Sequence, residues 1–269
     1  MVEQFTSRAY FICSDARTGS SLLSGMLRQT AVAGNPYEYF VEAEIDKPWL
    51  RKHELSVPDS EPFVSFRDWR DYILRAGSRP NGVFGASVHW FQFPNVLSTF
   101  AKDSSAPPAP VDALREFFPE LRLIWLCRKN IVAQAISHYV AIQTGLWDHS
   151  AYRASLEGAP PVIAGDRAPY DFAAIDWQVA SAKVARDGWR STLETARDLT
   201  LELTYEELSA DLAGSVTKVL GHLGQTLSFP MPPPDLWKQA GPWSLELEKM
   251  YRAERERRGG GPVGDEPLV

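Results

Sequence analysis

The chain has 269 residues, of which 44% are hydrophobic and 23% charged, with a formal net charge of −6. This length allows one large α/β domain or two small ones, and the composition is that of an ordinary soluble globular protein. The negative charge argues against nucleic acid as the main partner, no apolar run approaches the ~20 residues that span a bilayer, and the polar start predicts no secretory signal.

Strand and helix patterns alternate along the chain, which favours a central parallel sheet flanked by helices, an α/β fold. Strands are predicted at Ala9–Ser14, Gly82–Ser87, Leu121–Cys127 and Leu199–Thr204. Helices are predicted at Ser20–Thr30, Phe63–Gly77, Trp90–Ala101, Ile131–Gly145, Asp171–Arg197, Glu206–Gly224 and Leu236–Arg257. We expect one domain over residues 1–258.

Three segments are predicted to lie outside these elements. Ser104–Pro110 reads as a surface loop because of its prolines, and Glu157–Pro169, rich in Gly, Pro and Ala, reads as a mobile loop or lid. The tail, residues 259–269, lacks periodicity and is expected to be disordered.

The turn after the first strand has the composition of a phosphate-binding site. A strand that leads into a helix start presents free backbone N–H groups and the positive end of the helix dipole at one point. A guanidinium, hydroxyls and a glycine stand there: Arg17, Thr18, Gly19, Ser20 and Ser21. The alternative is a capped helix whose hydroxyls satisfy its own first turn.

A nucleoside triphosphatase loop is not present in this turn. That motif requires G-x-x-x-x-G-K-[ST], whereas this turn has one glycine, and Arg17 precedes it. We also find no apolar strand ending in an Asp that would hold magnesium. Both observations count against an ATP-dependent small-molecule kinase.

A second candidate anion site follows the third predicted strand. Arg128 stands at its carboxyl end, where open α/β sheets bind ligands, and Ser137 lies on the helix that follows. Together they can clamp a second phosphate, which indicates a ligand with two separated phosphate groups.

These residues belong to an ordered set of motifs that resembles the bacterial trehalose 2-sulfotransferase family, whose members use 3′-phosphoadenosine 5′-phosphosulfate. The resemblance runs from about Tyr10 to Glu254. The matching segments are Arg17–Leu23, Ala33–Phe40, Pro80–Gly85 leading to Trp90, Arg128 with Gln134–Ser137, Ala141–Trp147, Asp187–Arg190 and Tyr251–Glu254. Leu203–Leu208 is similar to a segment that is frequent in sulfotransferases using the same donor.

The resemblance implies sulfuryl transfer from that donor to a sugar hydroxyl, with Glu38 as the general base. It implies that Arg17 and the N–H groups of Thr18–Ser21 hold the 5′-phosphosulfate, and that Arg128 and Ser137 hold the 3′-phosphate. It also implies a homodimer. A secondary-metabolite hydroxyl as acceptor, and a non-catalytic nucleotide- or sugar-binding homologue, remain as alternatives.

Two positions depart from the family pattern. Ser87 stands where the family has a lysine, and His89 can partly replace that lysine as a hydrogen bonder or second base; a packed core histidine is the alternative. Lys129-Asn130 replaces the frequent Pro-Asp after Arg128, and Lys129 either reinforces the 3′-phosphate site or faces solvent.

No metal is expected, because the five histidines show no metal-ligand spacing. The two cysteines, Cys13 and Cys127, lie near the ends of predicted strands and read as small buried hydrophobes. A reducing, cytoplasmic setting is therefore predicted.

Overall fold

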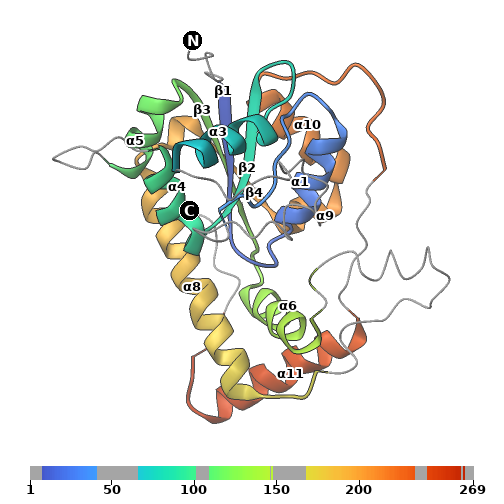
Figure 1. The fold of residues 1–269 in the computed structure, drawn as a ribbon. Helices are drawn as coiled ribbons and strands as arrows, with labels where there is room; N and C mark the ends of the chain where they lie inside the picture. The colour runs from blue at the N-terminus through green and yellow to red at the C-terminus, as the bar shows by residue number, and fades with distance from the viewer. Residues whose placement is uncertain are drawn as a thin grey trace.

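A computed structural model describes residues 8–40, 66–100, 109–145, 147, 168–233, 241–261 and 263. Its centre is a four-stranded sheet in the order β2-β1-β3-β4, with all neighbouring strands parallel (Figure 1). The strands are β1 (Arg8–Ser14), β2 (Val83–His89), β3 (Glu120–Cys127) and β4 (Thr200–Thr204). The predicted α/β class is confirmed, and each predicted strand is present within two residues of its expected ends.

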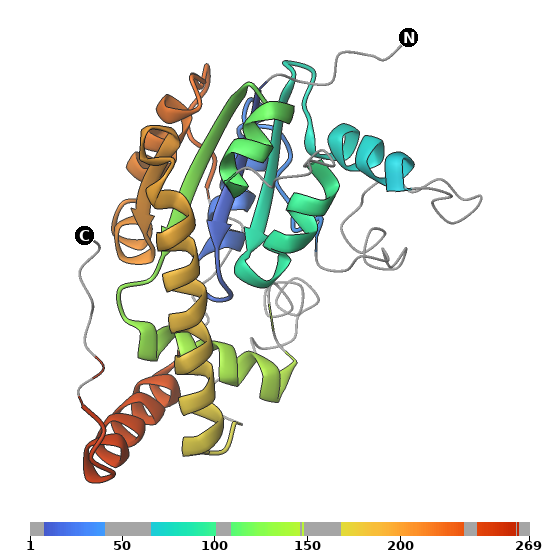
Figure 2. The same cartoon turned by 90° about the vertical axis from the view of Figure 1, so that its left-hand side faces the viewer.

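The helices surround this sheet on both faces and beyond its carboxyl end (Figures 1 and 2). They are α1 (Ser20–Gln29), α3 (Phe66–Gly77), α4 (Phe93–Phe100), α5 (Pro110–Phe117), α6 (Ile131–Thr144), α8 (Phe172–Glu194), α9 (Tyr205–Ala210), α10 (Leu212–His222) and α11 (Pro242–Arg257), with the short 3-10 helices η1 (Trp90–Gln92) and η3 (Arg197–Leu199).

The two faces of the sheet bury different halves of each strand, because successive side chains point to opposite sides. Phe11 and Trp125 pack with residues of α3, α4, α5 and α8 on one face. Tyr10 and Ile124 pack with residues of α1, α9 and α10 on the other. Burial on both faces explains why the strands read as continuous apolar runs in the sequence.

Parallel pairing brings the polar ends of three strands to one edge of the sheet. Ser14 of β1 is in register with His89 of β2, and Cys13 is in register with Trp125 of β3. The turn after β1, the end of β2 and the segment after β3 therefore meet below the sheet in Figure 1. There α6, α8 and α11 form a third apolar cluster beneath it.

Two predictions about helices are wrong in detail. The helix predicted over Glu206–Gly224 is two helices, because Asp211 ends α9 and its carboxylate accepts the backbone N–H of Gly214 as the cap of α10. Pro110, predicted to be in a loop, is the first residue of α5. Proline suits that position, since the first helical N–H has no intrahelical partner.

The predicted tail starts with packed residues. The N–H groups of Gly259 and Gly260 donate to carbonyls of the last turn of α11, and Val263 is buried, with its carbonyl accepting from Arg252 Nη1 at 2.8 Å. Disorder of residues 259–269 stays a prediction. Most of the predicted loop Glu157–Pro169 lies outside the described residues.

Both cysteines are buried free thiols that form no disulfide, as expected for small apolar side chains. Burial raises the pKa of the Cys127 thiol to about 12, which leaves it uncharged and unreactive at neutral pH. Among the described helices, none has the length and apolarity required to span a membrane.

Candidate active site

The turn between β1 and α1 has an unusual backbone. Arg17 has φ +66° and Gly19 has φ +92°, so two residues in the left-handed region bracket Thr18. The Thr18 hydroxyl donates to the carbonyl oxygen of Asp15 at 2.8 Å, a hydrogen bond that stabilises the turn. A long side chain rarely adopts positive φ, which indicates that the position of Arg17 serves a site rather than stability.

Gly19 is required in this turn for a second reason. A Cβ atom added there would lie 2.8 Å from Cδ2 of Tyr205, which is closer than packed carbon atoms approach. The Tyr205 ring in turn packs against the Arg128 guanidinium, with 4.5 Å between the ring centroid and the guanidinium carbon Cζ. One aromatic ring therefore supports both candidate anion sites.

We expect Gly19→Ala to lower the free energy of unfolding by about 2–4 kcal/mol, because left-handed strain and a clash with Tyr205 add together. Gly224→Ala is the matched control: its φ is +64°, but an added Cβ meets nothing within 4 Å. The control is expected to lose only about 1–2 kcal/mol in denaturant unfolding. Equal losses in the two variants would show that Tyr205 does not constrain the turn.

The N-terminus of α1 is open to a ligand. Gly19 occupies the N-cap position, no side chain caps the helix, and its first turn contains no acidic residue. The free N–H groups and the helix dipole therefore favour an anion at this end. Ser20 is buried beneath it, whereas Ser21 is exposed.

Arg17 extends from this turn toward α6. Its Nε donates to Ser137 Oγ at 2.9 Å, and its Nη1 donates to the carbonyl oxygen of Trp147 at 2.6 Å. Ser137 and Arg128 are expected from the sequence to hold one phosphate together, and the structure adds the contact of the Ser137 hydroxyl with Arg17. The two candidate anion sites are therefore adjoining parts of one surface.

Arg128 is held at the carboxyl end of β3 by several contacts. Its Nη1 donates to the Arg17 carbonyl oxygen at 3.4 Å, and its own carbonyl accepts a hydrogen bond from Arg186. Burial lowers the pKa of Arg128, an effect that the nearby Tyr205 and Glu206 oppose. Its Nε is buried without a hydrogen-bond partner. A buried guanidinium N–H without a partner fits a site for an anionic ligand.

The segment after Arg128 is fixed by a carboxylate. Glu206 accepts the backbone N–H groups of Lys129 at 3.0 Å and Asn130 at 3.3 Å, and Asn130 caps α6 by accepting from the N–H of Ala133. Lys129 is exposed.

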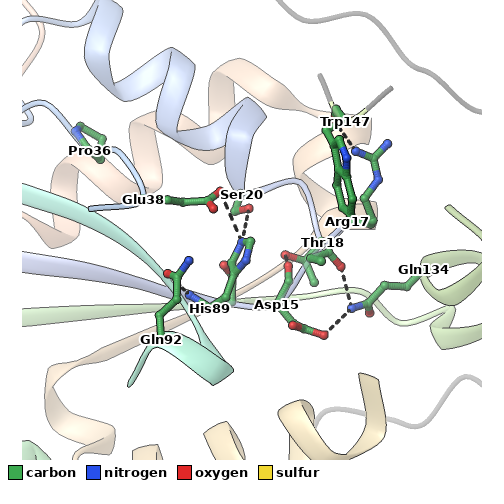
Figure 3. A network of polar contacts seen from close by, with 12 residues as sticks. Asp15, Arg17, Thr18, Ser20, Pro36, Glu38, His89, Gln92, Gln134 and Trp147 are labelled. Atoms are coloured by element: carbon green, nitrogen blue, oxygen red, sulfur yellow. Dashed lines mark hydrogen bonds and ion pairs between the residues drawn. The ribbon is translucent and has the colours of Figure 1, made fainter. Parts of the chain in front are cut away.

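Glu38 and His89 meet beside the start of α1 (Figure 3). His89 Nε2 lies 3.5 Å from Glu38 Oε1 and 3.5 Å from Ser20 Oγ. The segment that carries Glu38 runs beside β2, since the Ser87 N–H donates to the Tyr37 carbonyl at 2.9 Å. The His89 N–H donates to Gln92 Oε1 at 3.0 Å, which fixes the end of the strand.

Asp15 is a second carboxyl group in this region. It directly follows β1, and Gln134 Nε2 on α6 donates to it at 3.4 Å and to the Ala16 carbonyl at 3.0 Å. Burial raises the pKa of Asp15, and the nearby His89 lowers it. The Glu38 side chain, by contrast, is 31% exposed and accessible to a ligand.

Comparison with known proteins decides the family. A family model described as Stf0 sulphotransferase matches residues 9–254. The chain belongs to the Stf0 sulphotransferase family. The trehalose 2-sulfotransferase of Mycolicibacterium smegmatis is 30% identical over 269 residues, covering 93% of this chain and 97% of that protein. That of Mycobacterium tuberculosis is 27% identical, covering 94% and 97%.

Among solved structures, a sulfotransferase from Alicyclobacillus acidocaldarius is similar, with a TM-score of 0.47 and 17% identity over 93% of each chain. The predicted resemblance to the trehalose 2-sulfotransferases is thus confirmed by the sequence relatives of this Stf0 sulphotransferase.

Ser87, which stands where the family has a lysine, lies on β2 of this Stf0 sulphotransferase. Ser87 is two residues before His89 on β2, so both side chains are on the same face of the sheet. It is 2% exposed, and its hydroxyl has no hydrogen-bond partner.

Among the described residues, no group of three or more His, Cys, Asp or Glu side chains is placed to hold a metal ion.

Four residues of the site were not identified from the sequence: Asp15, Gln134, Trp147 and Tyr205. Gln134, Trp147 and Tyr205 lie in segments that carry the family motifs. The sequence of a motif does not show which of its side chains point toward the loop after β1. Asp15 had a usable signal, because it is a polar residue at the carboxyl end of an apolar strand.

His138, next to Ser137, is kept neutral. Burial and the positive charge of Arg17 lower the pKa of His138 to about 4. Its ring makes an edge contact with Trp147, with 5.5 Å between ring centroids. A neutral imidazole there adds no charge to the arginines of the site.

Proposed function

We propose that this protein transfers a sulfuryl group from 3′-phosphoadenosine 5′-phosphosulfate to a hydroxyl of a sugar. The observation that carries the proposal is the meeting of an uncapped helix start, two arginines and an accessible carboxylate at one edge of the sheet. Membership of the Stf0 sulphotransferase family supports the same reaction class.

In this proposal Glu38 accepts the proton of the acceptor hydroxyl. The hydroxyl oxygen then forms a bond to sulfur as the bond between sulfur and the phosphate oxygen breaks, and the electron pair leaves with adenosine 3′,5′-bisphosphate. Such in-line transfer depends mainly on positioning and charge stabilisation. Glu38 suits the role better than Asp15, because Asp15 already receives a hydrogen bond from Gln134.

Arg17 and the first N–H groups of α1 would hold the 5′-phosphosulfate and stabilise the charge that grows on the leaving phosphate. Arg128 would hold the 3′-phosphate through donors that include its unpartnered Nε. Ser137 would contribute through its contact with Arg17. His89 would keep Glu38 in place through its contact with the carboxylate.

The acceptor class comes from the relatives. Two trehalose 2-sulfotransferases cover almost the whole chain, which favours a carbohydrate hydroxyl. The same chemistry on a secondary-metabolite hydroxyl is the alternative acceptor. A homodimer and a cytoplasmic location, expected from the sequence, stay predictions.

One observation favours a second candidate function, a homologue that binds nucleotide or sugar without turnover. Ser87 replaces the family lysine by a short side chain whose buried hydroxyl makes no hydrogen bond. Such a protein would bind adenosine 3′,5′-bisphosphate but transfer no sulfuryl group to any acceptor.

The first test is a thermal-shift titration with adenosine 3′,5′-bisphosphate, beside ATP and AMP with and without magnesium. A ligand at 100 times its Kd adds about 2.7 kcal/mol of stability, which raises the Tm of a chain of this size by several degrees. We expect stabilisation by the bisphosphate that does not depend on magnesium. Stabilisation by ATP with magnesium alone, or by none of the three nucleotides, would contradict the proposal.

A further inference from the structure

Phe91 is a large apolar side chain that is exposed to solvent beside the site. It is 61% exposed, although its neighbour Gln92 in η1 is fully buried. Its ring makes an edge contact with His89, with 5.8 Å between centroids, and His89 contacts Glu38. The exposed ring and the candidate base thus both contact one imidazole.

The element that carries Phe91 is rigid. Trp90 packs edge-on against Trp189 at 5.2 Å between centroids and stacks on Phe93 at 6.0 Å. The indole of Trp90 lies so close to Gly188 of α8 that no side chain fits there. Because both neighbours are packed, the backbone at Phe91 is held beside the end of β2.

An exposed aromatic ring beside a binding site gains free energy when the apolar face of a ligand covers it and removes its surface from water. We infer that Phe91 is the acceptor platform: its ring packs against the apolar face of the sugar ring whose hydroxyl is presented to Glu38. Phe91 thereby selects acceptors that carry this hydroxyl on a ring over open-chain polyols. The inference rests on the proposed function.

The test compares two acceptors in two enzymes. Trehalose carries its hydroxyls on rings, whereas sorbitol is an open chain with hydroxyls of similar chemistry. In Phe91→Ala we expect the KM for trehalose to rise about tenfold, because an aromatic contact of this kind contributes about one factor of ten in affinity. We expect the kcat, the KM for sorbitol and the affinity for adenosine 3′,5′-bisphosphate to stay within about twofold of wild type.

Two variants complete the experiment. Phe91→Tyr keeps a ring at this place and should restore the KM for trehalose. Phe229→Ala removes another exposed aromatic side chain, 44% exposed, from the segment after α10, and should leave every constant unchanged. Since Phe91 is exposed, its loss should not prevent folding, which the Tm of each variant verifies.

The outcomes separate the inference from the proposed function. An unchanged KM for trehalose in an active Phe91→Ala enzyme, or an equal rise for trehalose and sorbitol, overturns the platform but leaves sulfuryl transfer intact. A wild type that transfers to no acceptor overturns the proposed function. In that case calorimetric binding of trehalose, weakened in Phe91→Ala but not in Phe229→Ala, still decides for or against the platform.

Discussion

Glu38→Gln is expected to lower the kcat for sulfuryl transfer by ~10²–10⁴-fold, the usual contribution of a positioned general base. The amide keeps the shape of the carboxylate and can still accept a hydrogen bond from His89, which lies 3.5 Å away. It cannot take a proton from the acceptor. The affinity for adenosine 3′,5′-bisphosphate should therefore stay unchanged, and steady-state kinetics with a calorimetric titration measures both quantities.

Two variants control this result. Glu116→Gln neutralises an exposed carboxylate on α5, a helix that packs in the core cluster of Phe11 and Trp125. This variant should leave kcat unchanged. Asp15→Asn neutralises the buried carboxyl group that also lies near His89. A larger loss of kcat in Asp15→Asn than in Glu38→Gln would assign the base to Asp15. Full turnover in Glu38→Gln would remove Glu38 from the mechanism.

Arg17→Gly should weaken binding of adenosine 3′,5′-bisphosphate by about 10- to 100-fold, because a charge-assisted contact contributes about 1.5–3 kcal/mol. Glycine adopts the φ of +66° found at Arg17 without strain. Relief of the left-handed strain, about 1–2 kcal/mol, and the greater chain entropy of glycine, about 0.5–1 kcal/mol, largely offset each other. The Tm should therefore change little.

Ala31→Gly is the matched control for Arg17→Gly. Ala31 follows α1 with a φ of +56°, so glycine relieves the same kind of strain without removing a charge. Nucleotide affinity should be that of wild type in this variant. Arg17→Lys should recover only part of the affinity, because an ammonium group lacks the planar fork of a guanidinium. Equal affinities for Arg17→Gly and Ala31→Gly would show that Arg17 does not contact the nucleotide.

The fold was predictable where local pattern and burial agree. The four strands are short apolar runs bounded by polar residues, and all were found from that pattern. Helix α5 was missed, because Pro110 looks like a helix breaker unless its place at the first helical position is known. The break at Asp211 was missed as well, because a capping aspartate and a solvent-facing helical aspartate look alike in the sequence.

The residues of the candidate site were found unevenly. Arg17, Glu38 and Arg128 were named because motifs mark them. Their mutual geometry was not: the contact of the Ser137 hydroxyl with Arg17 Nε, at 2.9 Å, is not indicated by the sequence. Which of two arginines reaches a serine more than a hundred residues away depends on side-chain directions across α6 and the turn after β1, and no local pattern contains them.

The sequence by itself determined the α/β class, the family and the strand-turn-helix that begins at β1, because each is read from short local segments and their order along the chain. Tertiary structure alone decided that Glu38, His89 and Ser20 meet, that Tyr205 supports both Gly19 and Arg128, and that Phe91 stays exposed beside them. The physical reason is the parallel sheet. Its register aligns strand ends from distant segments, so their polar residues gather at the carboxyl edge, where open α/β sheets bind ligands.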